Sequence, residues 1–394
     1  MNQGKYIFSQ IISLISHKSF YNCVKRYNGD YKTKQFTCWK QFLCMAFGQL
    51  THRESLSDTI LCLTANAAKL YHLGIGEVIS KTTLSRANEQ RNWKIYADLC
   101  MQLIQEAKSL YLNDDHSLEV DIDSNIFAID ATVIDVSLSA FYWAKYKHNR
   151  GGVKVHTQLD LKTSIPEFIE ITSGFVHELS IFDMVKYEAD SFYVVDRGYI
   201  DFERFYRIHC ANAFFITRAR SDFSFVRTKS YPADKERGVL CDQRVHAKKR
   251  SNFYVYKAYP ECFRRIKFYD AEQDRTFVFI TNNFSLKATD IAALYKHRWL
   301  IELFFKWIKQ HLKIKSFWGA SENAVKTQIW IAITVYVLVI IARKKFQLKQ
   351  SIYEILQVLS ISIFEKTPIQ NLFSNPKEQQ IFKELNDNQL KIFD

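Results

Sequence analysis

The stretch from Tyr295 to Lys315, YKHRWLIELFFKWIKQHLKIK, combines residue types that could bind both a metal ion and a phosphate. On a helix that turns by about 100° per residue, one narrow stripe is polar and apolar side chains fill most of the remaining surface. Such a helix packs into a core and presents its polar stripe outward. A carboxylate among fixed cations favours metal ligation beside a row of phosphate-binding groups, although solvated helix faces can show the same pattern. The stripe contains Tyr295, Arg298, Glu302 and Lys309, with Lys306 and Lys313 beside them.

Two aspartates could complete a metal site with Glu302. Asp130 ends the apolar segment IFAID and Asp196 ends the apolar segment FYVVD, and both segments are typical of buried strands. Active sites of α/β folds lie at the carboxyl ends of such strands. Three carboxylates together require a divalent cation, and oxygen ligands select Mg²⁺ or Mn²⁺. Two such ions can drive phosphodiester chemistry. Taken alone, each aspartate could equally be a turn former at the end of a strand.

Residues 1 to about 115 have the apolar spacing of helices. Within them, Gly74 and Gly76 precede the segment SKTTLSRANEQR, which Ser80, Thr82 or Thr83 could cap as a helix. A helix, a glycine turn and a capped helix with exposed polar residues are compatible with a helix-turn-helix, and equally with an ordinary helical hairpin. In the first case Arg86, Asn88, Gln90 and Arg91 would face DNA.

From about residue 122 the chain changes to short strands rich in β-branched and aromatic residues. IFAID and TVIDVS are expected to be separate strands, and helices are expected around Ile181–Glu188 and Phe202–Cys210. This order predicts an α/β domain with a mixed sheet flanked by helices. A second strand-rich block over residues 219–285, in which FYVYKAY is also expected to be a strand, predicts a β-rich insertion. Its basic edge is RVHAKKR, which includes Arg244, Lys248, Lys249 and Arg250.

The composition favours a polyanionic partner. Lys and Arg number 54 against 41 Asp and Glu, which gives a formal net charge of +13. This excess favours nucleic acid, although basic proteins also bind anionic membranes. The apolar run Ile329–Ala342 is shorter than the roughly 20 residues of a membrane span, so we expect a buried core helix. Without a C-x-x-C pair or a signal-peptide pattern, we expect a cytoplasmic, nucleoid-associated protein that binds neither a membrane nor a small-molecule cofactor.

The motifs resemble those of the insertion sequence 4 family of bacterial DDE transposases. Tyr295, Arg298, Glu302 and Lys309 match the family signature Y-x2-R-x3-E-x6-K. IDATVIDVS around Asp130 and VVDRGYIDFERF around Asp196 are similar to the two aspartate motifs of the family. TSGFVHE resembles the T-x-G-x-x-H-D element between them, with Glu178 where aspartate is more usual. The resemblance covers essentially the whole chain.

The resemblance implies a transposase that cuts and pastes a DNA element, with an RNase H-like core. Asp130, Asp196 and Glu302 would hold two Mg²⁺ ions, which Mn²⁺ could replace, and Tyr295, Arg298 and Lys309 would grip phosphates. An aromatic residue of the insertion, Phe277 or Phe279, could stack on an extruded base. The partners would be the terminal inverted repeats, target DNA and a second copy of the chain. The implied parts are a helical DNA-binding domain (1–118), a first core segment (119–218), the insertion (219–285), a second core segment (286–345) and a helical tail (346–394).

Two alternatives stay open at this level. A catalytically silent DNA-binding protein derived from a transposase would keep the basic charge and could lose a carboxylate. An RNase H-like nuclease would cleave without joining the freed 3′ end to a target. Nicking of element-end DNA with Mg²⁺ distinguishes a transposase from the silent DNA-binding protein. Joining of the freed 3′ end to target DNA distinguishes a transposase from the nuclease.

Overall fold

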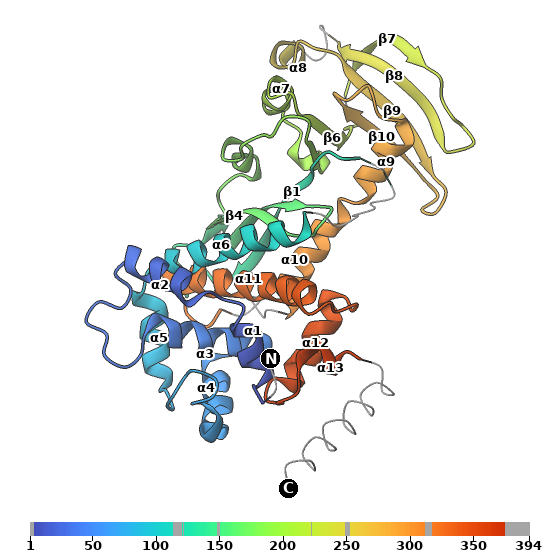
Figure 1. Cartoon of the computed structure of the whole chain (residues 1–394). Helices are drawn as coiled ribbons and strands as arrows, with labels where there is room; N and C mark the ends of the chain where they lie inside the picture. The colour runs from blue at the N-terminus through green and yellow to red at the C-terminus, as the bar shows by residue number, and fades with distance from the viewer. Residues whose placement is uncertain are drawn as a thin grey trace. The chain divides into compact units, whose positions relative to one another are not determined.

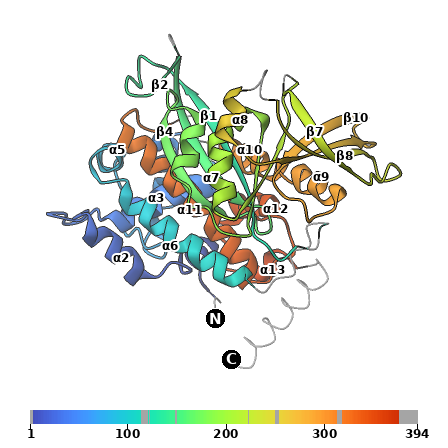
Figure 2. The same ribbon diagram turned by 90° about the horizontal axis from the view of Figure 1, so that it is seen from above.

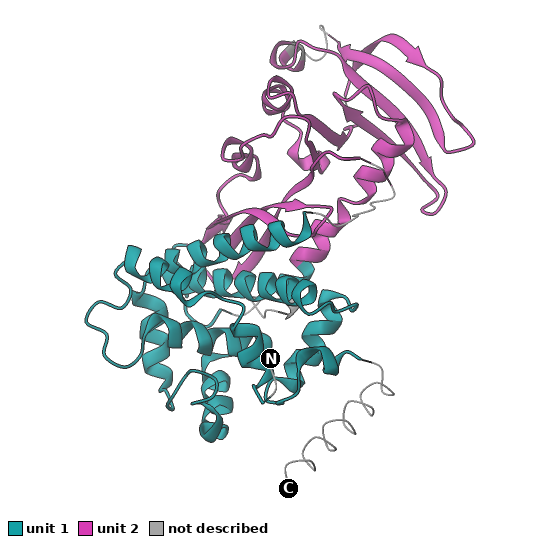
Figure 3. Cartoon of the chain, in the orientation of Figure 1, with its two compact units in different colours: residues 1–113, 139–143, 306–394 teal, residues 114–138, 144–305 magenta. Residues whose placement is uncertain are grey.

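The computed structural model describes residues 4–112, 120, 122–147, 150–221, 223–248, 253–311 and 317–374. The chain divides into two compact units (Figure 3). Unit 1 comprises residues 1–113, 139–143 and 306–394, and unit 2 comprises residues 114–138 and 144–305. The predicted five-part division of the chain stays a prediction.

Unit 1 is helical, and serine or threonine side chains cap many of its helices. Ser80 accepts a hydrogen bond from the Thr83 backbone N–H, which satisfies one of the free donors at the start of a helix. Ser351 and Glu354 form a reciprocal capping box. The helices of this unit are α1 (Ile7–Ile12), α2 (His17–Arg26), α3 (Cys38–Leu50), α4 (Leu56–Ala65), the 3₁₀ turn η1 (Ala67–Lys69), α5 (Lys81–Gln90), α6 (Lys94–Tyr111), α11 (Glu322–Lys345), α12 (Ile352–Ser362) and α13 (Ile369–Leu372).

Helix α11 is the core of unit 1. It packs against α6, α5 and α3, which surround it (Figures 1 and 2). By length and composition α11 could cross a membrane, but 94% of its apolar window is buried inside the protein. The expected core helix over Ile329–Ala342 is therefore confirmed.

Unit 2 is built on one mixed sheet flanked by helices, as predicted (Figure 1). The strand order is β2-β3-β1-β5-β6-β10-β9-β8-β7, and β4 pairs with β3. Strands β1, β5 and β6 run parallel, and the other pairs are antiparallel. The strands are β1 (Ile126–Val136), β2 (Lys145–Lys147), β3 (Arg150–Asp160), β4 (Pro166–Ser173), β5 (Phe192–Val195), β6 (Phe214–Arg218), β7 (Phe225–Tyr231), β8 (Val239–Ala247), β9 (Phe263–Asp270) and β10 (Arg275–Thr281).

An aromatic core joins one face of this sheet to helix α7. The rings of Phe205 on α7 and Phe215 on β6 stack with centroids 4.3 Å apart. Ile129 and Val195, the residues that precede the two candidate aspartates, are fully buried in the same cluster. The core therefore fixes the strand ends that carry the carboxylates. The helical elements of unit 2 are η2 (Glu178–Asp183), η3 (Arg197–Tyr199), α7 (Phe202–Cys210), α8 (Phe253–Ala258), α9 (Ala288–Lys296) and the first part of α10 (Trp299–His311).

Two segments of unit 2, FYVYKAY and Ile181–Glu188, do not have the predicted secondary structure. FYVYKAY is not a strand: Phe253–Ala258 form α8, because the helical spacing of Val255, Ala258 and Tyr259 places all three against the aromatic core. The helix expected over Ile181–Glu188 is instead the 3₁₀ turn η2, which begins at Glu178 and ends at Asp183. Side-chain bonds fix this segment, including one from Tyr187 Oη to the Phe182 carbonyl.

The expected continuous helix from Tyr295 to Lys315 is also interrupted. Helix α9 ends at Lys296 and α10 begins at Trp299. Between them the backbone makes 3₁₀-type hydrogen bonds, in which an N–H donates to the carbonyl three residues earlier, such as Arg298 N–H to the Tyr295 carbonyl at 3.1 Å. Residues 312–316 lie outside the described residues. Tyr295 therefore lies on α9, Arg298 in the connection and Glu302 on α10, and Arg298 contacts both of the other residues.

Candidate active site

Asp130 and Asp196 lie at the ends of the parallel pairing between β1 and β5. The register pairs Ile129 with Val195, and the next residue of the chain after each is an aspartate, Asp130 within β1 and Asp196 directly after β5. Parallel strands bring their carboxyl ends to the same edge, where α/β folds place ligands. The prediction that a strand ends at Asp130 is wrong, because β3 continues to pair with β1 as far as Val136. What ends at this point is the pairing with β5.

Asp196 is held by two donors that converge on one carboxylate oxygen. Tyr295 Oη donates to Oδ1 at 3.2 Å, and Arg218 Nη2 donates to the same atom at 3.1 Å. Burial raises the pKa of Asp196, but the Arg197 backbone N–H, the Arg218 guanidinium and the charge of Arg298 outweigh it and hold the pKa below its usual value. Asp196 is therefore ionised at neutral pH.

Asp130 is in the opposite electrostatic situation. Burial raises its pKa to about 6, against the opposing effects of the Ala131 backbone N–H and Arg298. The Ala131 N–H donates to Oδ1 at 2.8 Å, whereas Arg298 Nη1 stays 3.7 Å from Oδ2. The negative charges of Asp196 and Glu178 raise the pKa further. The negative charge of ionised Asp130 is thus only partly compensated by Arg298.

Arg298 lies between Asp130 and the third candidate carboxylate. Its Nη2 pairs with Glu302 Oε1 at 2.5 Å, and its Nε has no hydrogen-bond partner among the described residues. The Glu302 side chain is 57% exposed, so it can turn toward or away from the aspartates. Within the described ranges, no three acidic, histidine or cysteine side chains are close enough to form a ready metal cage.

The donor chemistry nevertheless fits a divalent cation. The available ligands are carboxylate oxygens, which suit Mg²⁺ and Mn²⁺ rather than softer metals. Asp130 carries a buried charge that Arg298, at 3.7 Å, compensates only in part. A cation bound beside Asp130 would supply the missing positive charge.

Three residues of the site were not predicted as site residues from the sequence. Arg218 bonds Asp196, and its guanidinium lies over the rings of Tyr295 at 5.6 Å and Phe277 at 5.9 Å. The available signal was its place at the end of β6, the third parallel strand. Tyr199 is buried beside Asp130, and burial followed by the charge of that aspartate raises its pKa. The third is Glu178, whose charge acts on both Asp130 and Tyr199.

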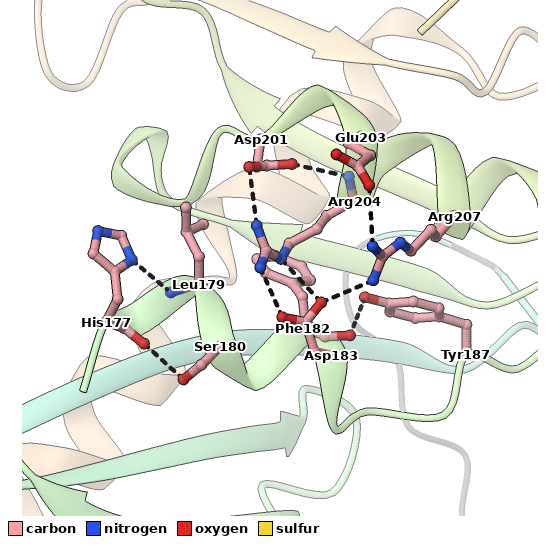
Figure 4. A network of polar contacts seen from close by, with 10 residues as sticks. All are labelled: His177, Leu179, Ser180, Phe182, Asp183, Tyr187, Asp201, Glu203, Arg204 and Arg207. Atoms are coloured by element: carbon pink, nitrogen blue, oxygen red, sulfur yellow. Dashed lines mark hydrogen bonds and ion pairs between the residues drawn. The ribbon is translucent and has the colours of Figure 1, made fainter. Parts of the chain in front are cut away.

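A surface network anchors the segment that carries Glu178 (Figure 4). Asp183, at the end of η2, accepts hydrogen bonds from Arg204 Nη2 at 2.7 Å and from Arg207 Nη1 at 2.8 Å, both on α7. His177 caps the start of η2 by accepting from the Leu179 backbone N–H. These contacts tie both ends of η2 in place. They therefore hold Glu178 near the aspartates.

A cavity of about 960 Å³ opens beside the site, and its lining includes Arg218, Arg298 and Glu302. The two aromatic candidates for base stacking differ in accessibility. Phe279 is 2% exposed and packs against Tyr295 with ring centroids 5.0 Å apart. Phe277 is half-buried, so its ring is the one that a ligand could reach without rearrangement.

The other predicted DNA contacts are spread over both units and stay predictions. Arg86 on α5 is exposed, whereas Asn88, expected on the same exposed face, is 3% exposed and bonded to Gln41. Arg91 also serves the interior of unit 1, because it donates to Gln41 Oε1 at 3.0 Å and to the Phe36 carbonyl. Lys309 is half-buried on α10, in the part that belongs to unit 1. Arg244 on β8 and Lys248, directly after β8, are exposed. Lys249 and Arg250 lie outside the described residues.

Comparison with known proteins gives matches to transposases. The family described as Transposase DDE domain matches residues 121–338, more than half of the chain, and a domain of unknown function (DUF4372) matches residues 3–76. A Sinorhizobium fredii protein named as a transposase, y4zB, is 33% identical over 231 residues, which are 58% of this chain and 64% of the relative. A Geobacillus stearothermophilus protein named as a transposase for insertion sequence element IS5377 is 28% identical over 219 residues, 53% of this chain and 54% of the relative.

The matches thus span less than two thirds of the length of either relative. Among solved structures, the piggyBac transposase in a synaptic complex with hairpin DNA is similar with a TM-score of 0.45 and 11% identity, over 96% of this chain and 82% of that one. A likeness of that size carries no argument about fold or function. The family match is decisive by itself, and proteins with this domain generally use divalent metal ions. The chain belongs to the transposase DDE domain family.

Proposed function

We propose that the protein is a cut-and-paste transposase of the insertion sequence 4 family, which binds the ends of an insertion sequence, cleaves them and joins the 3′ ends to target DNA. The observation that carries the proposal is the meeting of Asp130 and Asp196 at the end of one parallel strand pair, with Tyr295 bonded to Asp196 and Arg298 paired with Glu302. These residues come from widely separated motifs of the chain.

The sheet order supports the RNase H-like core that the resemblance implies. Strands β4, β3 and β1 form an antiparallel series, and β5 and β6 continue parallel to β1. Helix α7 connects β5 to β6 as a crossover. In this proposal β7 to β10 correspond to the insertion, and residues 1–118 to the DNA-binding domain.

Asp130, Asp196 and Glu302 would hold two Mg²⁺ ions, and bound ions of this kind activate the attacking oxygen and stabilise the leaving one. The chain itself supplies binding and orientation. Arg298 can exchange its bond to Glu302 for a bidentate bond to a phosphate, which would also release the Glu302 carboxylate. Tyr295 and Arg218 fix the orientation of Asp196. Lys309 would add a point charge to the DNA backbone.

Base stacking and pairing of DNA ends belong to the same proposal. Phe277 is the better of the two stacking candidates, because Phe279 is covered by Tyr295. Joining both ends of an element requires two active sites, so a homodimer on paired ends is expected. The setting proposed for this reaction is the bacterial nucleoid.

The test is cleavage of element-end DNA with Mg²⁺ by the wild type and by Asp130→Asn, Asp196→Asn and Glu302→Gln. Each variant should lose nicking while binding the DNA end as before. Full nicking in any one of them would remove that residue from the metal site. Absence of nicking in the wild type would favour the silent DNA-binding protein. Nicking without joining of the 3′ end to target DNA would favour the nuclease.

A further inference from the structure

A second pocket, of about 320 Å³, lies at the open edge of β10. Strand β6 ends at Arg218, which pairs with Phe279 of β10. The residues of β10 that precede Phe279 therefore extend beyond the end of β6 and do not pair with it. The chain that leaves β6 folds along this edge, where the Ala219 N–H bonds the Val278 carbonyl at 2.8 Å. The volume is within the roughly 300–1,000 Å³ that is usual for ligand sites.

Five arginines line this pocket, and its described lining contains no aspartate or glutamate. Like charges gathered in one small space repel one another, so an anion is expected among them. The arginines are Arg197, Arg218, Arg220, Arg265 and Arg275.

Most of this positive charge is not balanced within the described parts of the chain. Arg218 pairs with Asp196, and Arg265 Nη1 donates only to the neutral groups Gln243 Oε1 at 3.1 Å and Cys241 Sγ at 3.2 Å. Arg197 and Arg275 are exposed, and neither has a carboxylate within 4.0 Å among the described residues. Among the described residues, Arg218 is therefore the one arginine of this pocket with a carboxylate partner.

Aromatic rings hold several of these guanidiniums in place. Arg265 lies over the Phe225 ring at 4.6 Å, and Arg275 and Arg218 both lie over Phe277, at 5.4 and 5.9 Å. Stacking occupies the flat face of a guanidinium and leaves its N–H edge free to donate. Such an edge matches the geometry of phosphate oxygens.

The pocket adjoins the candidate active site. It shares Arg218, Arg275 and Phe277 with the 960 Å³ cavity that Arg298 and Glu302 line. Arg218 also bonds Asp196. A DNA strand in the larger cavity could therefore extend into the arginine pocket across one wall. A pocket of this volume accommodates a phosphate and its sugar, but not a duplex.

We propose that this pocket binds a phosphate of a single DNA strand as that strand leaves the carboxylate site. The inference rests on the proposed function for the identity of the strand, but the pocket's preference for an anion does not depend on catalysis. The phosphate is either an internal diester or the terminal 5′-monoester that hydrolysis leaves on the flanking strand. The monoester carries more negative charge and would gain more from several arginines.

The test measures binding of short single-stranded oligonucleotides, with a 5′-phosphate or a 5′-hydroxyl, by fluorescence anisotropy in EDTA. The full chain with Arg265→Gln and Arg275→Gln is compared with the wild type. The matched control is Arg227→Gln with Lys229→Gln, which removes the same charge from exposed β7 positions that line neither pocket. Arg275→Gln alone, at an exposed position, is a second variant in case the double variant is less stable.

The pocket variant should bind about tenfold more weakly than the control, with a salt slope lower by about 0.7 for each lost phosphate contact. A wild-type preference for the 5′-phosphate that disappears in the variant identifies the terminal monoester. Equal losses on both oligonucleotides identify an internal diester. Weakening no greater than in the control would overturn the proposal. The binding assay contains EDTA and no divalent metal, so its result does not depend on whether the protein cleaves DNA.

Discussion

Two arginine–aspartate arrangements in unit 2 are built from the same groups and differ in how completely they are satisfied. Between strands β8 and β9, Arg264 donates to Asp242 Oδ1 at 3.0 Å and Oδ2 at 2.7 Å, and its Nη1 bonds the Leu286 carbonyl at 2.6 Å. Both side chains are almost fully buried. At the strand ends, Arg298 reaches Asp130 only at 3.7 Å and keeps an unpartnered Nε within the described structure.

The difference is between an ion pair whose hydrogen-bonding groups are all used and one in which some are not. A buried charge pair holds a fold together when each donor and acceptor is used, as in Arg264 and Asp242. Charges left with unused hydrogen-bonding capacity and a shifted pKa are typical of a site that awaits a ligand. The energetic cost of the buried charge is visible at Asp130, because burial raises the pKa of this residue to about 6.

The largest expected effect is that of Asp130→Asn on chemistry. Cleavage of element ends should fall by about 10³-fold or more, because a metal ligand is lost. The same change should leave the free energy of unfolding unchanged or raise it by about 1–3 kcal/mol, because a costly buried charge is removed. Urea unfolding measured beside nicking checks both. A clear loss of stability would place Asp130 among the structural pairs instead.

Asp242→Asn should show the reverse pattern. It leaves the Arg264 guanidinium buried without its partner charge, which should cost about 3–5 kcal/mol of stability. Replacing both partners, with Arg264→Met and Asp242→Leu, should recover most of that loss. Thermal and urea melts measure the three variants. If the single and double variants were equally unstable, loss of packing rather than an uncompensated charge would be the cause.

The pH dependence of stability should distinguish Asp130 from a second buried group, His156. Burial, followed by the charge of Lys154, lowers the pKa of His156 to about 4. Between pH 6.5 and 4 the unfolded chain therefore binds a proton that the folded chain does not, so stability should fall by about 3 kcal/mol as the pH falls.

Asp130 acts in the opposite direction over an overlapping range. Its folded-state pKa of about 6 lies above the usual 3.8, so the folded state binds the extra proton and stability rises as the pH falls from 6. The wild type should thus vary little, Asp130→Asn should lose stability steeply on acidification, and His156→Gln should gain it. Unfolding midpoints of the three proteins at pH 7, 5.5 and 4.5 are sufficient to distinguish these profiles. Parallel profiles for all three proteins would exclude this compensation.

A smaller effect is expected from Arg218→Gln. Loss of its bond to Asp196 should raise the pKa of that carboxyl and lower cleavage about 10–100-fold, as removal of a group that orients a ligand does. Stability should change by less than about 1 kcal/mol, because the Asp196 side chain is partly exposed. Cleavage and melting of Arg218→Lys give the control. Its partial recovery of activity would show that charge matters as well as the hydrogen bond.

The motifs could be found from the sequence, but the exact bounds and type of some of the strands and helices around them could not. The apolar strand that precedes Asp196 and the four-residue spacing of Arg298 and Glu302 are local, so they were visible before the structure. The continuation of β1 beyond Asp130 depends on β3, and the helical state of Phe253–Ala258 depends on the aromatic core. Pairing with β3 and burial against the aromatic core come from distant parts of the chain, so the local pattern alone does not reveal them, and tertiary packing overrode the strand propensity of FYVYKAY.

The sequence by itself determined which residues could do chemistry: two aspartates after apolar segments and a Tyr, Arg and Glu at helical spacing. Local periodicity is sufficient for this, because it reflects neighbours three or four residues apart on a helix or two apart on a strand. Only the tertiary structure decided that β1 and β5 pair in parallel, that Arg218 from β6 joins Asp196, and that Arg298 lies between Asp130 and Glu302. Those outcomes depend on strand order and on burial of charge, which arise from contacts between distant parts of the chain.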